Sequence, residues 1–197
     1  MSEQIPSYTD IIACDFSFRR PGFAHLRYYP MGRKVSVIET SNINNKTARD
    51  KCDGEILSEI AHELRRYIAT NPMAIIIRER ALDMQAGPRY SRTIEALHKV
   101  VGVSDLYAWG LGNREFYEIH PKTIKKLVAN NQLAEKEEVA NALVQFVGER
   151  EYACDDESDA VAVGVAWLIQ EGKIDTPYAK EVPKKTTKKK AKKTDGE

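Results

Sequence analysis

Four acidic residues differ from the other acids of this chain in where they lie. Asp15 and Glu79 each come at the end of a short apolar run that is typical of a buried strand. Asp156 and Asp159 are three residues apart, a spacing that places both side chains on one face of a helix. A carboxylate at the end of a buried strand is costly unless it is paired or bound to a metal ion.

Carboxylate oxygens are the ligands that Mg²⁺ and Mn²⁺ prefer in proteins. Two such ions roughly 4 Å apart can activate water and stabilise the leaving oxygen during phosphodiester cleavage. We therefore expect Asp15, Glu79, Asp156 and Asp159 to be catalytic metal ligands. The expected ion is Mg²⁺, two per active site, with Mn²⁺ as a substitute.

Each acid also has a purely structural explanation. Asp156 and Asp159 could simply favour the start of a helix, with Ser158 as its cap. Asp15 could begin a turn, and Glu79 could pair with a neighbouring arginine at the surface. The order of the acids along the chain, two strand ends followed by an apolar helix, favours the metal site.

The apolar pattern predicts an α/β architecture around these acids. The expected strands are 7–15, 23–30, 33–40, 73–77 and 116–120. The expected helices are 48–69, 91–101 with an extension toward 111 left open, 121–128, 135–147 and 156–170, and a loop is expected at 80–92. Three antiparallel strands followed by strands that alternate with helices indicate a mixed sheet with parallel strands, flanked by helices.

The charge is distributed unevenly along the chain. The whole sequence carries a formal charge of +1, but residues 183–197 hold seven lysines and only two acids. The remaining 182 residues therefore carry −4, which is unlike a simple phosphate-binding surface. We expect one folded domain at 1–176 and a disordered, lysine-rich tail at 177–197. The tail could add salt-sensitive affinity for DNA, which the acidic body favours, or only increase solubility.

The composition also predicts where the protein functions. The longest apolar run, at 160–169, is about half of what a bilayer span needs, so no membrane association is expected. Cys14, Cys52 and Cys154 are odd in number and lack metal-ligand spacing. We interpret them as small buried apolar residues in a reducing compartment, which predicts a cytoplasmic protein.

Several motifs together resemble the RuvC family of Holliday junction resolvases, particularly its divergent phage-encoded members. The run Ile12-Ala-Cys-Asp15 resembles the family's first strand, and Ala74-Ile-Ile-Ile-Arg-Glu79 resembles the strand that ends in its catalytic Glu. The segment Asp156-Glu-Ser-Asp159-Ala-Val-Ala-Val is similar to its Asp-x-x-Asp-Ala-Leu-Ala helix. The stretch from Pro121 to Lys136 resembles the basic segment upstream of that helix. The resemblance spans roughly residues 8–172.

The resemblance implies an RNase H-like fold and a homodimer that nicks four-way DNA junctions symmetrically in a Mg²⁺-dependent reaction. It also implies phosphate contacts by Lys125 and Lys136, and DNA contacts by Arg80, Arg89 and Arg92 around the loop that follows the catalytic Glu. The helix carrying Ile94, Leu97, Val100 and Val101 is either the dimer interface or an ordinary helix that faces the core.

Some questions stay open from the sequence. Asp155 or Glu157 could replace Asp156 as the ligand at the start of the last helix. Asp15 is followed by Phe-Ser-Phe-Arg-Arg-Pro-Gly, where cellular members of the family usually have Pro-Gly directly. The alternatives to a junction-resolving enzyme are a non-catalytic dimer that binds branched DNA, and a nuclease of broader specificity that cuts forks and flaps.

Overall fold

One mixed five-stranded sheet organises the chain. The computed structural model describes residues 8–46, 50–81, 88–112 and 114–178. Its strands are β1 (Thr9–Asp15), β2 (Gly22–Tyr29), β3 (Lys34–Asn42), β4 (Ile75–Glu79) and β5 (Tyr117–Ile119). Their spatial order is β3-β2-β1-β4-β5. The first three strands are antiparallel, whereas β4 runs parallel to β1 and to β5, so the predicted mixed sheet is confirmed.

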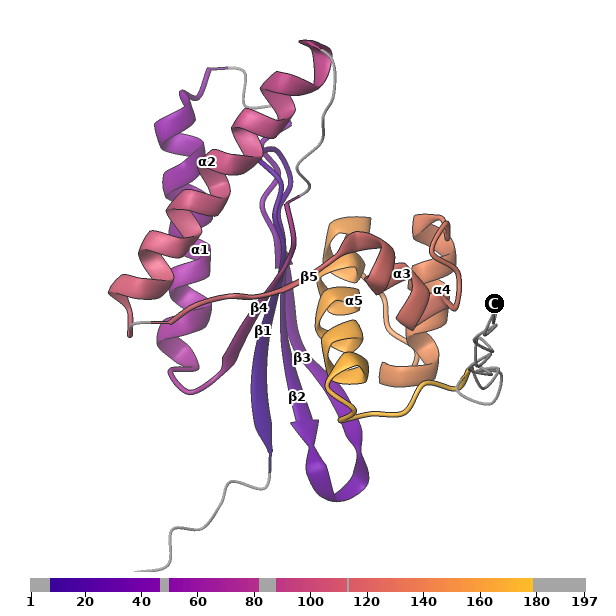
Figure 1. Ribbon diagram of the computed structural model, residues 1–197. Coiled ribbons are helices and arrows are strands. Elements are labelled where there is room, and N and C mark those ends of the chain that lie inside the picture. Colours follow the sequence, from indigo (N-terminus) through magenta and orange to yellow (C-terminus); the bar gives the residue numbers. More distant parts are fainter. Residues whose placement is uncertain (1–7, 47–49, 82–87, 113, 179–197) are drawn as a thin grey trace, which may run out of the picture.

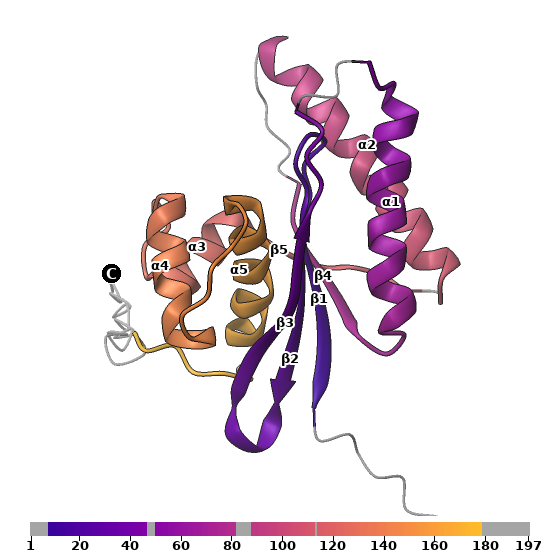
Figure 2. The same cartoon turned by 180° about the vertical axis from the view of Figure 1, so that it is seen from behind.

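Helices cover both faces of this sheet. They are α1 (Asp53–Thr70), α2 (Pro88–Gly110), α3 (Pro121–Ala129), α4 (Lys136–Val147) and α5 (Asp155–Gln170), and the 3-10 turn η1 (Pro30–Gly32) joins β2 to β3. α1 and α2 lie on one face, and α3, α4 and α5 lie on the other, as Figure 1 and the view from behind in Figure 2 both show. Within the described ranges, no helix is both long enough and apolar enough to cross a membrane.

The side chains of β1 alternate between two hydrophobic cores, because successive residues of a strand point to opposite faces. Ile11 and Ala13 pack in the core under α3, α4 and α5. Ile12 and Cys14 pack in the core under α1 and α2. All four side chains are fully buried, which confirms the prediction of a first strand covered on both faces. By the same alternation, Asp15 is directed to the face that carries α5.

The structure differs from the sequence-based expectations at two helix starts. α1 begins at Asp53, later than predicted, with Cys52 as its N-cap. α2 begins at Pro88, so the expected loop at 80–92 is shorter than predicted. Proline is well tolerated in the first turn of a helix, where a backbone N–H has no intrahelical partner. α2 continues to Gly110, so the extension that the sequence left open is present.

The prediction of buried cysteines is wrong for one of the three, and the prediction of a lysine-rich tail is not tested by the structure. Cys14 is buried and Cys154 is partly buried, but Cys52 is exposed, so the prediction of a buried thiol was wrong for Cys52. Residues 179–197, which hold nearly all of the predicted lysine-rich tail, lie outside the described residues. The division of the chain at residue 176 therefore stays a prediction.

Two glycines allow α5 to approach the sheet closely. A Cβ atom at Gly164 would lie 2.0 Å from Cδ1 of Leu26 and 3.1 Å from Cβ of Ala13. A Cβ atom at Gly22 would lie 1.8 Å from the carbonyl oxygen of Asp156. The first residue of β2 therefore contacts the backbone at the start of α5, and this contact sets where the acids of α5 lie.

We expect Gly22→Ala to lower the free energy of unfolding by about 1–3 kcal/mol, because the added methyl group must displace the Asp156 backbone. The matched control is Gly102→Ala in α2, where no atom lies within 4 Å of the added Cβ. Alanine at such a helical position stabilises by about 0.5–1 kcal/mol. The free energy of unfolding of both variants is measured by urea titration, with circular dichroism as the signal. A Gly22→Ala protein as stable as the unaltered chain would contradict the close approach.

Candidate active site

Asp15 and Glu79 lie next to each other at the C-terminal ends of β1 and β4, because these two strands are parallel neighbours in the sheet. The residues that precede them, Cys14 and Arg78, are register partners. Ile77 packs in the core under α5, so the alternation along β4 directs Glu79 to that face and Arg78 to the opposite one. The two strand-end carboxylates therefore share one face of the sheet.

Arg78 does not pair with Glu79, as one structural explanation of Glu79 would require. Arg78 is buried on the other face, where its guanidinium lies 2.6 Å from a carboxylate oxygen of Asp105 and 2.7 Å from one of Glu118. Arg80 is exposed, and among the described residues no ion pair joins it to Glu79. The carboxylate of Glu79 is therefore left for the cluster beneath α5.

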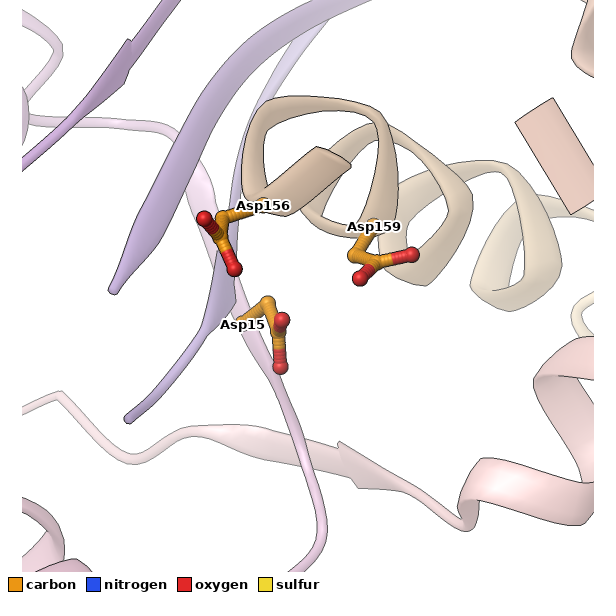
Figure 3. Close-up of side chains that lie close together, drawn as sticks. All are labelled: Asp15, Asp156 and Asp159. Atoms are coloured by element: carbon orange, nitrogen blue, oxygen red, sulfur yellow. The ribbon is translucent and has the colours of Figure 1, made fainter. Parts of the chain in front are cut away.

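The start of α5 supplies the other two acids. Asp156 lies in the first turn, and Asp159 lies almost one turn further along the helix. One carboxylate oxygen each of Asp15, Asp156 and Asp159 lies within 4.8 Å of the others, and Figure 3 shows the three side chains gathered where β1 ends beside α5. Glu79 lines a cavity of about 300 Å³ together with Asp15 and Asp159. The structure thus brings the four predicted acids together.

The two acids next to Asp156 in the sequence, Asp155 and Glu157, do not belong to the cluster. Glu157 is buried, and its carboxylate accepts hydrogen bonds of 2.8 Å from the Thr40 hydroxyl and of 2.8 Å from the Asn42 amide. Asp155 is exposed to solvent. Of the three consecutive acids, Asp156 is the one whose oxygen belongs to the cluster. Glu157 instead ties the start of α5 to β3.

Ser158 is not the cap of α5. Cys154 occupies the N-cap position, and the Ser158 hydroxyl donates a hydrogen bond of 2.8 Å to the carbonyl oxygen of Asp155. Asp156 does lie in the first turn, where the helix dipole favours a negative charge. This position is compatible with a role as a ligand, because the carboxylate oxygen of Asp156 still lies with those of Asp15 and Asp159.

Crowding of the carboxyl groups changes their pKa values. Burial, and then the charges of Glu79 and Asp159, hold the pKa of Asp15 well above its usual value. Burial, and then the charge of Asp159, raise the pKa of Glu79 to about 7. Burial also raises the pKa of Asp159, although its ion pair with Lys136 opposes the shift. Either protons or a cation would relieve this cluster, so its residues fit a divalent metal ion.

The stability of the protein without metal should therefore fall as the pH rises from about 4.5 to about 7, because the folded state binds the proton of Glu79 more tightly than the unfolded chain does. Glu79→Gln should raise the free energy of unfolding by about 1–3 kcal/mol at pH 8 and change it little at pH 4.5. Urea unfolding in a chelator at the two pH values measures this difference. The exposed Glu149, substituted in the same way, serves as the control; a Glu79→Gln effect that is independent of pH would contradict the prediction.

Both lysines that were predicted to contact phosphate line the acidic cavity. Lys136 is the first residue of α4, and its ammonium group pairs with the carboxylate of Asp159. Lys125 lies in α3, and its charge lowers the pKa of Glu79. Two positive side chains from two helices therefore face the cluster of carboxylates.

The three predicted arginines are distributed differently. Arg80 is exposed, and it directly follows Glu79, a residue that lines the acidic cavity. Arg92 lines a separate cavity of about 630 Å³ between the loop after β1 and α2. Arg89 belongs to α2, but its side chain lies outside the described residues. The structure therefore groups the two lysines, and not Arg92, with the acids.

The sequence predicted no role for Arg20, which also reaches the site. Its Nε lies 2.8 Å from Oδ2 of Asp156. Arg20 belongs to the loop between β1 and β2, whose sequence after Asp15 differs from the Pro-Gly expected from the family. No spacing signal could have revealed this contact, because the two residues are distant in the sequence and meet only where the loop packs on α5.

The same fold occurs in solved structures of Holliday junction resolvases. No family model and no curated protein matches the sequence. The chain is similar to T. thermophilus RuvC in complex with a Holliday junction substrate, with a TM-score of 0.70, 15% identity, and coverage of 85% of this chain and 99% of that one. The yeast mitochondrial Holliday junction resolvase has a TM-score of 0.58 at 12% identity, with coverage of 87% and 82%. The fowlpox virus resolvase has a TM-score of 0.54 at 15% identity, with coverage of 83% and 99%.

These similarities first define a class: an α/β protein of RNase H-like fold with an acidic centre between the sheet and one helix. Within that class, the fold of this chain is that of RuvC. The resemblance predicted from the motifs is thereby confirmed for the fold.

Proposed function

We propose that this protein is a structure-selective endonuclease that resolves Holliday junctions, and other branched DNA, by hydrolysing phosphodiester bonds. The observation that carries the proposal is the cluster of Asp15, Asp156 and Asp159, whose ligand oxygens lie within 4.8 Å of one another. The RuvC fold supports it, because the similar structures are junction resolvases. Glu79 and Lys136 at the same cavity supply the remaining acid and a cation for the substrate.

The donor set fits hard divalent cations, which favour carboxylate oxygens. Asp15, Glu79, Asp156 and Asp159 would hold Mg²⁺, with two ions at each site and Mn²⁺ as a substitute. When bound, the ions would supply an activated water molecule and stabilise the leaving oxygen. The raised pKa values of Asp15 and Glu79 support this assignment, because a bound cation offsets both causes, the burial of the charged carboxylates and their mutual repulsion.

The basic side chains of the chain would hold the DNA. Lys125 and Lys136 line the cavity, where they can donate hydrogen bonds to phosphate oxygens beside the bond to be cut. Lys136 pairs with Asp159 in this structure, so it would exchange a carboxylate partner for a phosphate partner. Arg80, Arg89 and Arg92 would contact the DNA farther from the cut.

The proposal is tested by cleavage of a four-way junction, a fork and a linear duplex of matched sequence. We expect Mg²⁺-dependent, symmetric paired nicks in the junction and far slower cutting of the duplex. Asp15→Asn and Asp159→Asn should lower junction cleavage by about a hundredfold or more, because a neutral amide is a poor substitute for a ligating carboxylate. Both variants should still bind the junction.

Glu149→Gln is the control, because Glu149 is an exposed acid outside the site. Full-rate cleavage by either Asn variant would contradict the site assignment. Equal cutting of all three DNAs would indicate the broader nuclease. Junction binding by the unaltered protein without cleavage in Mg²⁺ or Mn²⁺ would indicate the non-catalytic dimer.

A homodimer is part of the proposal, since a junction offers two strands related by approximate two-fold symmetry. Val100 of α2 is fully buried inside the chain, and Leu97 packs partly against the same core, so these two residues face the core and not a partner. Leu106 and Trp109 of α2 are 68% and 57% exposed. Their spacing of three puts them on one face, where we place the contact between subunits.

The double substitution Leu106→Glu with Trp109→Glu should convert the dimer to a monomer, because two like charges would meet their symmetric copies across the interface. Sedimentation velocity measures the mass, and the junction assay should show single nicks in place of paired ones. Leu133→Glu is the matched control, since Leu133 is 73% exposed and lies outside α2. A double variant that remains dimeric would exclude this face as the interface.

A further inference from the structure

Arg20 contacts one of the carboxylates that would bind metal. Its Nε lies 2.8 Å from Oδ2 of Asp156, and both side chains are largely shielded from solvent, at 26% and 16% exposure. The Arg20 contact is an ion pair without a hydrogen bond from Nε, whereas the Cys154 thiol donates a hydrogen bond to Oδ2 of Asp156 at 3.5 Å. In the part of the chain that the structure describes, no hydrogen bond reaches Oδ1 of Asp156. Oδ2 of Asp156 is thus engaged by two neighbours, whereas Oδ1 can accept a further partner.

The loop that carries Arg20 is fixed at several points. The Arg20 backbone N–H donates to the Ser17 hydroxyl at 2.9 Å. The backbone N–H of Asn45 donates to the Arg19 carbonyl oxygen at 2.8 Å, and the N–H of Ile43 donates to the Pro21 carbonyl oxygen at 3.2 Å. These bonds tie the loop to the segment that follows β3, so the guanidinium reaches Asp156 from an anchored backbone.

The same region is in direct contact with α5. Gly22, two residues after Arg20, lies so close to the carbonyl oxygen of Asp156 that no Cβ atom fits between them. Backbone contact therefore sets where Asp156 lies, and the Arg20 guanidinium sets which way its carboxylate turns. Carboxylates that bind metal ions usually need such a second hydrogen-bonding or ionic partner to orient them.

We propose that Arg20 is a positioning residue of the metal site, which orients the Asp156 carboxylate so that its free oxygen joins those of Asp15 and Asp159. This role rests on the proposed function, since it gives the acidic cluster its metal ion. Arg20 acts through Asp156 and has no assigned contact with DNA. It lies in the loop after Asp15, where this chain has Phe-Ser-Phe-Arg-Arg-Pro-Gly.

A different role for Arg20 would have the opposite effect on metal binding. If Arg20 were only a counter-charge for Asp156, it would compete with the incoming cation, and its removal would tighten binding. If Arg20 positions the carboxylate, its removal weakens binding, and the loss of an outer partner of this kind typically costs about 10–100-fold in metal affinity. The sign of the change distinguishes the two roles.

The test is a titration of the full chain with Mn²⁺ in the absence of DNA. The electron paramagnetic resonance signal of free Mn²⁺ measures how much of the ion is bound. We expect Arg20→Ala to raise the dissociation constant about tenfold, and Arg20→Lys to recover most of the affinity, since an ammonium group can still pair with Asp156. Arg19→Ala is the matched control, because it removes the same charge from the same loop, while the Arg19 guanidinium bonds to the Asn45 carbonyl oxygen and not to the acids. Urea unfolding of each variant verifies that the fold is retained.

Unchanged or tighter binding by Arg20→Ala would overturn the proposal. So would a loss that Arg20→Lys does not recover, or an equal loss in Arg19→Ala, since either would reflect a disturbed loop. An unaltered protein that does not bind Mn²⁺ would overturn this proposal together with the metal site. The expected pattern of Mn²⁺ binding, combined with failure to cleave any branched DNA, would leave the role of Arg20 standing and refute only the nuclease.

Discussion

Mutual repulsion of carboxylates is the constraint that the rest of this structure must satisfy. Asp15, Asp156 and Asp159 place oxygens within 4.8 Å of one another, and Glu79 lies at the same cavity. Burial raises the pKa of Asp15 and of Glu79, and the neighbouring like charges raise it further. Folding brings these groups together at a cost that protons, cationic side chains or metal ions can offset. This cost links the stability of the protein to its proposed chemistry.

Cationic side chains of the chain itself offset part of that repulsion. Lys136 pairs with Asp159, and Arg20 pairs with Asp156, each from an element outside the sheet and α5. Such ion pairs help to orient the carboxylates, as partners around the ligands of a metal site do. The two cations differ in their proposed fates. Lys136 can turn to a phosphate, whereas Arg20, on an anchored loop, remains with its carboxylate.

Much of the fold could be predicted from local patterns. The continuous apolar run in β1 and the β-branched run before Glu79 predicted both strands, and the small apolar residues after Asp159 predicted a helix buried on nearly all sides. The starts of α1 and α2 were less accurate, because the position of a helix start depends on which capping contacts form. Val100 shows the same limit, since a helical apolar stripe looks alike whether it packs on its own core or on a partner.

The sequence by itself determined the chemical types at the site: four acids in the order strand end, strand end and helix, with Lys125 and Lys136 between them. Tertiary structure decided which of three adjacent acids belongs to the cluster, because Thr40 and Asn42 of β3 bind Glu157 and leave Asp156 beside Asp15. It also decided the role of Arg20, whose partner is more than a hundred residues away in sequence. Periodicity and spacing report neighbours within one element. Contacts between elements depend on how closely backbones approach, as Gly22 and Gly164 allow here.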